Sequence, residues 1–490
     1  MKEYLTTIGL EVHVQLKTKS KMFCSSSAEY FGAPPNSHTC PVCLGLPGAL
    51  PVTNQKAIDS AVKVGLALNC RVNNFTKFDR KNYFYPDLPK GYQISQYDLP
   101  ISQKGNLLLE QKKIRINRAH MEEDTGKLIH TKIDGKEASL VDFNRSGVPL
   151  LEIVSEPDLE SPEEARKYAK RLHQIMRYLE VADADMEKAG MRFDANVSIR
   201  PKGQKEFGTK VEIKNINSFS FLEKALTYEI NRQVTELDKG KKIVQETRGW
   251  VEGKGETVSQ RTKETSPDYR YFPEPDLPPL NISDQLINKL KKEIPELPDA
   301  KAARFKRDYS LDEYDCIQLT ESKEIANWFE EAVFDYSKLE QRKGTIDHID
   351  SRKAKLVANW VLGEVLRVLN EGGTKIRDSR LEPAGLVELL HLIESGKVTQ
   401  SSAKQIFNKM FATGMLPAKI LQEEDLGQIS SNEEIAQILD EVIRENEEAA
   451  DDFRKGKEAS LKFLIGQLMR KTKGKADPQI VGKILTEKLR

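Results

Sequence analysis

Long apolar runs and an excess of charge of one sign are both missing from the sequence. No stretch approaches the roughly 20 apolar residues of a membrane span, and the N-terminus lacks the basic and then apolar layout of a secretion signal. We therefore expect a cytoplasmic protein with no membrane partner. Lysine and arginine total 76 against 75 aspartate and glutamate residues, so a uniformly basic nucleic-acid-binding surface is excluded and any RNA contact must be a local patch.

Cysteine is scarce, and the standard nucleotide motifs do not occur. The five cysteines are an odd number clustered mostly before residue 71, which does not fit a disulfide framework and leaves metal binding or simple burial. The sequence has no Walker A loop, no Gly-x-Gly-x-x-Gly loop and no nucleophile elbow. Nucleotide binding therefore cannot be inferred from a standard phosphate loop.

The first part of the chain has the pattern of a sheet. Every second residue of 10–16 is apolar and the residues between them are polar, and the same alternation returns over 193–200 and 211–214. This pattern predicts strands with one apolar face. A helix is expected to begin after Asn217 or Ser218, both good N-caps, and to pack on that sheet.

The later part of the chain has helical spacing. A proline-rich segment at 272–279 cannot continue a helix or a central strand, so we expect the first domain to end just beyond it. After about Ile294 the apolar spacing becomes helical, and a capping box from Ser431 to Glu434 precedes one such helix. The sequence thus predicts an α+β protein of two or three domains, as 490 residues favour.

Carboxylates and one imidazole are the first candidates for chemistry. Glu11 and His13 would lie on one strand face about 6.6 Å apart, which suits two ligands of one metal ion but is equally the pattern of a solvated strand face. Glu152 lies inside an apolar run and needs a cation, a metal or a proton, so an ion pair serves it equally well. Glu122 and Glu123 belong to a run of carboxylates that must be solvated or neutralised. A site built from these residues would favour magnesium or manganese over zinc.

Cys24, Cys40 and Cys43 form a second candidate site. Cys40 and Cys43 have the spacing that is common in zinc knuckles. Three thiolates do not complete a tetrahedral zinc site, and His38 is the candidate for a fourth ligand. Buried free cysteines are the alternative interpretation.

Cations and aromatic residues alternate over 77–87, which includes Lys81. This alternation suits phosphate contact and base stacking, or a core of aromatics with exposed charges. Four arginines are further candidate phosphate ligands, or structural residues: Arg145, Arg192, Arg200 and Arg248. Basic residues between 454 and 475 surround an apolar stripe and form either an RNA-binding patch or a solvated helix face.

Several of these segments, taken together, resemble the B subunits of tRNA-dependent amidotransferases, the GatB family. The resemblance begins with Ile-Gly-Leu-Glu-Val-His-Val-Gln-Leu at 8–16 and continues, in the same order along the chain, through 77–87, 120–127, 141–158, 190–200, 209–218 and 268–276. The tail resembles the YqeY-like domain of that family. The likeness covers essentially the whole chain.

The resemblance implies a fold and an activity. We expect a sheet-based, kinase-like cradle domain at 1–292, an all-α helical domain at 293–405 and a small helical, YqeY-like tRNA-binding tail at 406–490. A glutaminase partner, the A subunit, would supply ammonia, and a C subunit would wrap between A and B. The B subunit would use ATP to phosphorylate the side-chain carboxylate of misacylated Glu-tRNA(Gln) or Asp-tRNA(Asn), and ammonia would then displace phosphate to form the amide. This division of labour fits the lack of a Cys-His glutaminase or Ser-rich amidase core in the sequence.

The resemblance also assigns roles to residues. It implies magnesium ligands at Glu11, His13, Glu122 and Glu152. Lys81 and Glu123 resemble positions at the exit of the ammonia tunnel, where a charged gate would take a proton as ammonium becomes ammonia. Many relatives have Cys-x-Cys before Cys-x-x-Cys, whereas this chain has Ser26 where the second thiol would stand, so the implied zinc site lacks one ligand.

Two other functions compete with this interpretation. A non-catalytic tRNA-binding scaffold would use the basic tail and leave the carboxylates structural. A self-contained small-molecule amide ligase would use the same metal and ATP without tRNA.

Overall fold

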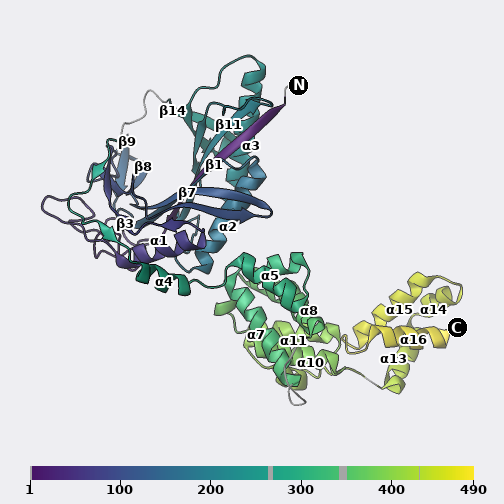
Figure 1. Ribbon diagram of the computed structural model, residues 1–490. Helices are drawn as coiled ribbons and strands as arrows, with labels where there is room; N and C mark the ends of the chain where they lie inside the picture. Colours follow the sequence, from purple (N-terminus) through teal and green to yellow (C-terminus); the bar gives the residue numbers. More distant parts are fainter. Residues whose placement is uncertain (1–2, 263–268, 341–349, 430, 490) are drawn as a thin grey trace. The chain divides into compact units, whose positions relative to one another are not determined.

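The computed structural model describes residues 3–262, 269–340, 350–429 and 431–489 (Figure 1). Asp268, the first residue of one resembling block, lies outside the described residues. The chain divides into two compact units, Met1–Leu297 and Pro298–Arg490. The first unit has one apolar core and the second has two, and each unit is described by itself.

A large sheet forms the first unit, with the strand order β14-β13-β12-β11-β1-β10-β7-β6-β2. Its strands, in chain order, are β1 (Tyr4–Gln15), β2 (Arg71–Val72), β6 (Ser102–Leu109), β7 (Lys112–Glu123), β10 (Pro149–Ser155), β11 (Met191–Pro201), β12 (Val211–Ile216), β13 (Glu246–Val251) and β14 (Glu256–Thr262). Neighbouring strands are antiparallel, except that β12 and β13 run parallel.

Shorter strands and several helices complete the first unit. The other strands are β3 (Phe75–Thr76), which pairs with β16 (Leu280–Asn281), β4 (Asp79–Asn82), which lies between β5 (Tyr92–Ser95) and β15 (Phe272–Pro273), and the hairpin of β8 (Lys127–Ile133) and β9 (Lys136–Asp142). The helices are α1 (Gln55–Ala67), α2 (Pro162–Tyr178), α3 (Phe219–Asp238), α4 (Asp284–Lys292) and the short turn η1 (Glu252–Lys254).

The two faces of the large sheet differ in polarity. Every second residue of β1 from Ile8 to Val14 is fully buried, and these side chains share one core with residues of α1, α2 and α3. The residues between them, which include Glu11 and His13, point to the other face, because successive strand residues alternate in direction. The alternation predicted for β1, β11 and β12 is confirmed, and its consequence is a polar sheet face.

The helix expected after Ser218 is confirmed. The Ser218 Oγ accepts a hydrogen bond from the Phe221 amide at 3.0 Å, which caps the first turn of α3. Helices α1 and α2 were not expected within the sheet-based part. Helix α4 also begins before Ile294, where helical spacing was expected to start, and its Leu290 packs in the core of the first unit.

The described residues of the second unit are helical and include no strand. The elements are α5 (Pro298–Tyr309), α6 (Glu313–Leu319), α7 (Lys323–Glu340), α8 (Ser351–Trp360), η4 (Val361–Val365), α9 (Leu366–Gly372), η5 (Ile376–Asp378), α10 (Pro383–Glu394), α11 (Gln400–Thr413), α12 (Pro417–Glu423), α13 (Asn432–Glu445), α14 (Glu447–Arg454), α15 (Glu458–Lys471) and α16 (Pro478–Leu489). None of the helices in the described ranges is long and apolar enough to cross a membrane.

The second unit contains two apolar cores. One gathers buried residues from Phe305 to Leu426, and the other gathers residues from Ile435 to Leu489. The boundary expected after residue 405 falls inside α11, because Ile406 and the residues after it continue the buried face of that helix into the first core. The Ser431 cap is observed, with the Oγ accepting from the Glu434 amide at 3.3 Å.

Candidate functional site

The polar face of the large sheet brings ionisable residues from three adjacent strands together. His13 of β1 lies opposite Glu152 of β10, and Glu152 lies opposite His120 of β7. Directly opposed residues of paired strands point to the same face. The register therefore gathers these side chains, together with Glu122 two residues after His120, above the centre of the sheet.

Glu152 is the hub of this cluster. Its Oε2 lies 3.3 Å from Nε2 of His13 and 3.4 Å from Nε2 of His120, which also approaches Oε1 of Glu122 at 3.5 Å. Glu122 and Glu152 are 2% and 6% exposed. Ligand atoms of His13, Glu122 and Glu152 all lie within 4.8 Å of one another. These three residues, all expected from the sequence, thus meet at one point.

Mutual charge sets the protonation of the cluster. Burial disfavours the imidazolium of His120, but the neighbouring carboxylates, Glu152 first, outweigh it and raise the pKa to about 9. The pKa of His13 is raised for the same reason. Burial opposes ionisation of Glu122, but Lys81 and His120 together outweigh it and lower the pKa to about 2. The cluster therefore holds two ionised carboxylates balanced by nearby cations.

The small three-stranded sheet supplies further contacts to Glu122. Nζ of Lys81, from β4, lies 3.5 Å from the carboxylate, and Ser95 and Gln93 of β5 donate hydrogen bonds to it at 2.9 and 3.2 Å. Lys81 also lies over the ring of Tyr269, 5.2 Å from its centroid. Lys81 thus lies beside the cluster, between a carboxylate and an aromatic face.

Glu123 has different partners from Lys81. The next residue of β7 after Glu122, it pairs with Lys90, and its Oε1 accepts a hydrogen bond from the Ile94 amide at 3.0 Å. Lys81 therefore pairs with Glu122, and Lys90 pairs with Glu123. Lys90 was not among the residues expected from the sequence.

Glu11 belongs to a neighbouring acidic group. Ligand oxygens of Glu11, Asp194 and Glu212 lie within 4.8 Å of one another, because Glu11 opposes Asp194 of β11 in the sheet register. Asn196 donates to Glu11 at 2.9 Å, and Lys214 pairs with the other two carboxylates at 3.0 and 3.2 Å. Burial, and then Glu152, raise the pKa of Glu11. The four expected magnesium ligands are therefore divided between two adjacent groups.

The four arginines lie in three different places. Arg192 opposes His13 and pairs with buried Asp124 at 3.0 Å, and Arg145 approaches the same carboxylate at 3.6 Å. Arg248 lies opposite Ile213, on the core side of the sheet, where it approaches Glu229 of α3 at 3.4 Å. Arg200 lies at the far end of β11. The structure thus brings Arg192 and Arg145 close to the cluster and keeps Arg200 and Arg248 away from it.

The three cysteines expected to act together do meet. The sulfur atoms of Cys24, Cys40 and Cys43 lie within 4.8 Å of one another in a group that does not include His38. A hydrogen bond from the Cys24 thiol, together with Lys21 and the Cys40 amide, lowers the pKa of Cys43 to about 4. Ser26 hydrogen-bonds Cys24. The residue that replaces the fourth cysteine thus lies beside the other three.

Basic residues of the tail are in part neutralised. Lys471 pairs with Glu441 and Glu445 at 3.1 and 2.7 Å, and Lys475 pairs with Asp425 at 2.6 Å. Arg454 and Lys457 pair with nearby aspartates. The expected basic patch therefore carries less free charge than its composition implies.

The cluster of His13, Glu122 and Glu152 offers two carboxylates and one imidazole, a donor set that suits magnesium or manganese. Lys81 and the two imidazoles balance the carboxylates by themselves, so an ion bound here would require His13 to release its proton. The structure thus defines a protein of mixed α/β fold, in which the polar face of a large sheet buries a group of potential divalent-cation ligands and a helical unit follows along the chain. Comparison with known proteins identifies its family.

Residues 6–288 match the GatB/GatE catalytic domain, and residues 343–489 match the GatB domain that is named after YqeY. Two relatives are the aspartyl/glutamyl-tRNA(Asn/Gln) amidotransferase B subunits of Carboxydothermus hydrogenoformans and Thermodesulfovibrio yellowstonii. The first is 50% identical over 494 residues, which cover 100% of this chain and 99% of the relative. The second is 51% identical over 487 residues, with 99% and 98% covered. The chain belongs to the GatB family, the B subunits of tRNA-dependent amidotransferases.

Proposed function

We propose that this chain activates the side-chain carboxylate of misacylated Glu-tRNA(Gln) or Asp-tRNA(Asn) by phosphorylation with ATP. A carboxylate oxygen attacks the γ-phosphorus, ADP leaves, and ammonia then attacks the acyl carbon and expels phosphate. The products are Gln-tRNA(Gln) or Asn-tRNA(Asn), ADP and inorganic phosphate. The relatives' printed name, which couples both tRNAs to an amidotransferase, supports the choice of substrates.

The observation that carries this proposal is the buried group of His13, Glu122 and Glu152. Phosphoryl transfer between two anions requires positive charge at the reacting oxygens and exclusion of water. A magnesium ion, when bound, would supply that charge. The sheet holds the three side chains by strand register rather than on loops, so they are placed before substrate arrives.

Lys81 would neutralise charge on the reacting groups. Burial lowers the pKa of Lys81, but nearby negative charges, of which Glu122 has the largest effect, outweigh burial and raise it. The amine therefore stays protonated at every pH at which the enzyme works. Tyr83 and Tyr271 form edge-on contacts with Tyr269, the ring beneath Lys81. These aromatic faces beside a cation suit the terminal adenosine of an acceptor end.

Glu123 would act as the proton acceptor for incoming ammonium. Its partner Lys90 is 10% exposed and Glu123 is 3% exposed, so the pair is shielded as a gate requires. We propose that Lys81 and Glu123 lie near the point where ammonia enters from the glutaminase partner. In this scheme the A and C subunits and the misacylated tRNA are the partners, and the first unit is the catalytic cradle.

ADP formation tests this function. The chain, co-purified with its A and C partners, would be given magnesium, ATP, free ammonia and either Glu-tRNA(Gln) or correctly charged Glu-tRNA(Glu). We expect ADP and Gln-tRNA with the misacylated tRNA alone. Free ammonia removes any dependence on glutaminase activity.

A matched pair of variants localises the chemistry. Glu152→Gln should abolish ADP formation while tRNA affinity is retained. Glu137→Gln, which removes an exposed carboxylate from the β8–β9 hairpin of the same unit, should leave both unchanged. Tight tRNA binding with no ADP from the wild-type complex would favour the scaffold, and ADP formation without any aminoacyl-tRNA would favour a small-molecule ligase.

A further inference from the structure

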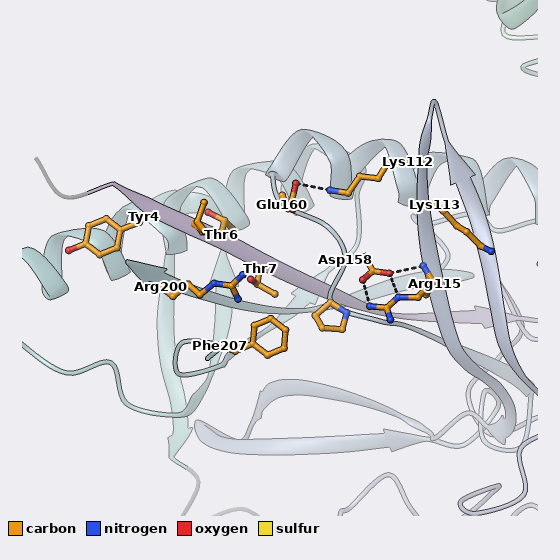
Figure 2. A pocket seen from close by; sticks show the side chains of 12 residues that line it. Tyr4, Thr6, Thr7, Lys112, Lys113, Arg115, Asp158, Glu160, Arg200 and Phe207 are labelled. Atoms are coloured by element: carbon orange, nitrogen blue, oxygen red, sulfur yellow. Dashed lines mark hydrogen bonds and ion pairs between the residues drawn. The ribbon is translucent and has the colours of Figure 1, made fainter. Parts of the chain in front are cut away.

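A polar pocket lies on the first unit, away from the cluster. Its volume is about 540 Å³, within the usual range for small-ligand sites. It is lined by the first residues of β1 and β7, the segment that follows β10, the last part of β11 and the loop after it (Figure 2).

The sheet register places the pocket far from the cluster on the same sheet face. Leu5 opposes Arg200 at the pocket, whereas His13 opposes Arg192 at the cluster. Eight strand residues span about 26 Å. Pro157 lies between the two sites, 3.7 Å from where a side chain on Gly9 would begin. A phosphate held by Arg200 is therefore a different phosphate from one held at the cluster.

Two of the cations in the pocket already have partners. Arg115 donates three hydrogen bonds to Asp158 at 2.6 to 2.9 Å, and Lys112 pairs with Glu160 at 2.9 Å (Figure 2). These pairs involve both acidic residues of the lining, Asp158 and Glu160. Lys113 and Arg200, in contrast, have no carboxylate within 4.0 Å among the described residues. The pocket thus carries two uncompensated positive charges.

Two nitrogens of Arg200 also lack hydrogen-bond acceptors within the described part of the chain. Its Nε and Nη1 are shielded from solvent and have no hydrogen-bond acceptor among the described residues. A buried charged donor without an acceptor is unfavourable, and such a group calls for an acceptor from outside the chain. The Arg200 side chain points toward Thr7 in the pocket (Figure 2). An anion bound in the pocket would supply the missing acceptor after a small shift of the guanidinium.

Phe207 provides an apolar surface next to this charge. Its ring centroid lies 5.1 Å from Cζ of Arg200, yet the residue is 61% exposed, so one ring face remains open. The loop is held tightly at Gly208, where a Cβ would meet the Ile199 carbonyl oxygen at 2.0 Å. An aromatic ring backed by a guanidinium and open on its other face is the arrangement on which nucleic acid bases stack.

We propose that this pocket binds a nucleotide unit, with its phosphate on Arg200 and its base on Phe207. Lys113, which lies beyond the Arg115–Asp158 pair (Figure 2), adds positive charge at the other end of the lining. The same chemistry could come from the backbone of a tRNA or from a free nucleotide. Binding to this pocket can be measured without turnover, so its test is independent of the reaction proposed for the cluster.

Three variants and a control test the pocket in the chain co-purified with its partners. Lys113→Gln and Arg200→Gln each remove one uncompensated charge, and Phe207→Ala removes the ring. Lys205→Gln removes a charge from the same exposed loop outside the pocket lining and is the matched control. Affinities for tRNA and for ATP and AMP would be measured by filter binding and equilibrium dialysis at several salt concentrations.

The proposal predicts a weaker affinity for one class of ligand. Phe207→Ala should lower it at least about fivefold, and loss of a phosphate contact should make the salt dependence shallower by about 0.7 to 0.9 in log–log slope. A loss confined to tRNA identifies RNA as the ligand, and a loss confined to ATP or AMP identifies a free nucleotide.

Folding defects are separated by two further comparisons. Lys113 is exposed, so Lys113→Gln should leave the melting temperature unchanged. Arg200→Lys keeps the charge and should retain more affinity than Arg200→Gln. Affinities for tRNA, ATP and AMP that all equal those of Lys205→Gln, in variants with wild-type melting temperatures, would overturn the proposal.

Discussion

Replacement of Glu152 by glutamine should remove a proton from the centre of the cluster at mildly alkaline pH. The substitution preserves shape and removes the charge that contacts His13 at 3.3 Å and His120 at 3.4 Å. Burial alone lowers the pKa of His120, and Glu152 is the largest single cause that raises it to about 9. Without that carboxylate the pKa should fall toward the ordinary 6.5 or below it, a change worth about 3 kcal/mol of proton affinity.

The sign of this effect follows from the charges. In the wild-type chain at pH 8, His120 is protonated because its pKa is about 9. In Glu152→Gln it should be neutral at that pH, because burial remains and the main anionic partner is gone. The titration of His120 should therefore have its midpoint near pH 9 in the wild-type chain and at or below about pH 7 in the variant.

Nitrogen spectra of the imidazole rings measure this directly. The chain has seven histidines, and long-range proton–nitrogen correlations on metal-free protein from pH 6 to 10 would follow each one. His120→Gln identifies the relevant signal, and Glu137→Gln serves as the charge-matched control. A midpoint that stays near pH 9 in Glu152→Gln would refute the assignment of Glu152 as the charge hub.

Three further predictions address the framework around the site. Asp124→Asn should cost about 3–5 kcal/mol in the free energy of unfolding, because Arg192 and Arg145 lose the buried carboxylate that they share; a loss below about 1 kcal/mol in denaturant titrations would contradict this. Burial, and then Arg177, lower the pKa of His173 to about 4. The free energy of unfolding should therefore be independent of His173 above pH 6.5, and it should decline by about 2 kcal/mol, allowing for partial exposure, as the pH falls to 4, because the unfolded chain then takes up the proton more readily. His173→Gln should remove that decline, as unfolding at pH 7 and pH 4 would show. Ser26→Cys should raise zinc affinity at least about tenfold by adding a fourth thiolate beside Cys24, and equal zinc retention in competition with a chelator would argue against a metal role for the cysteines.

Local patterns predicted the strands and one helix well. The alternation in β1 reports which residues face the core, and Ser218 reports where α3 begins, because both signals depend on residues within one element. Helix α2 carried a usable signal in Ser161 and Pro162, an N-cap followed by proline in the first turn. Helix α1 lacks a comparable proline signal, and Gly65 weakens its helical pattern.

The composition of the site depended on strand register, which local patterns do not contain. Spacing within β1 suggested that Glu11 and His13 converge on one ion. In the sheet, His13 opposes Glu152 while Glu11 opposes Asp194, so each joins a different group. Asp194 and Glu212 became candidates only when β11 and β12 were placed beside β1. The arginines were ambiguous for the same reason, since Asp124 and Glu229 come from distant segments.

The central claim is that the side-chain carboxylate of the misacylated tRNA is phosphorylated. Glu-tRNA(Gln) labelled with oxygen-18 in that carboxylate, given to the complex with ATP and ammonia, tests this most directly. Phosphoryl transfer to the carboxylate predicts inorganic phosphate that carries one oxygen-18 atom per amide formed. Unlabelled phosphate, or the label in AMP instead, would contradict the account.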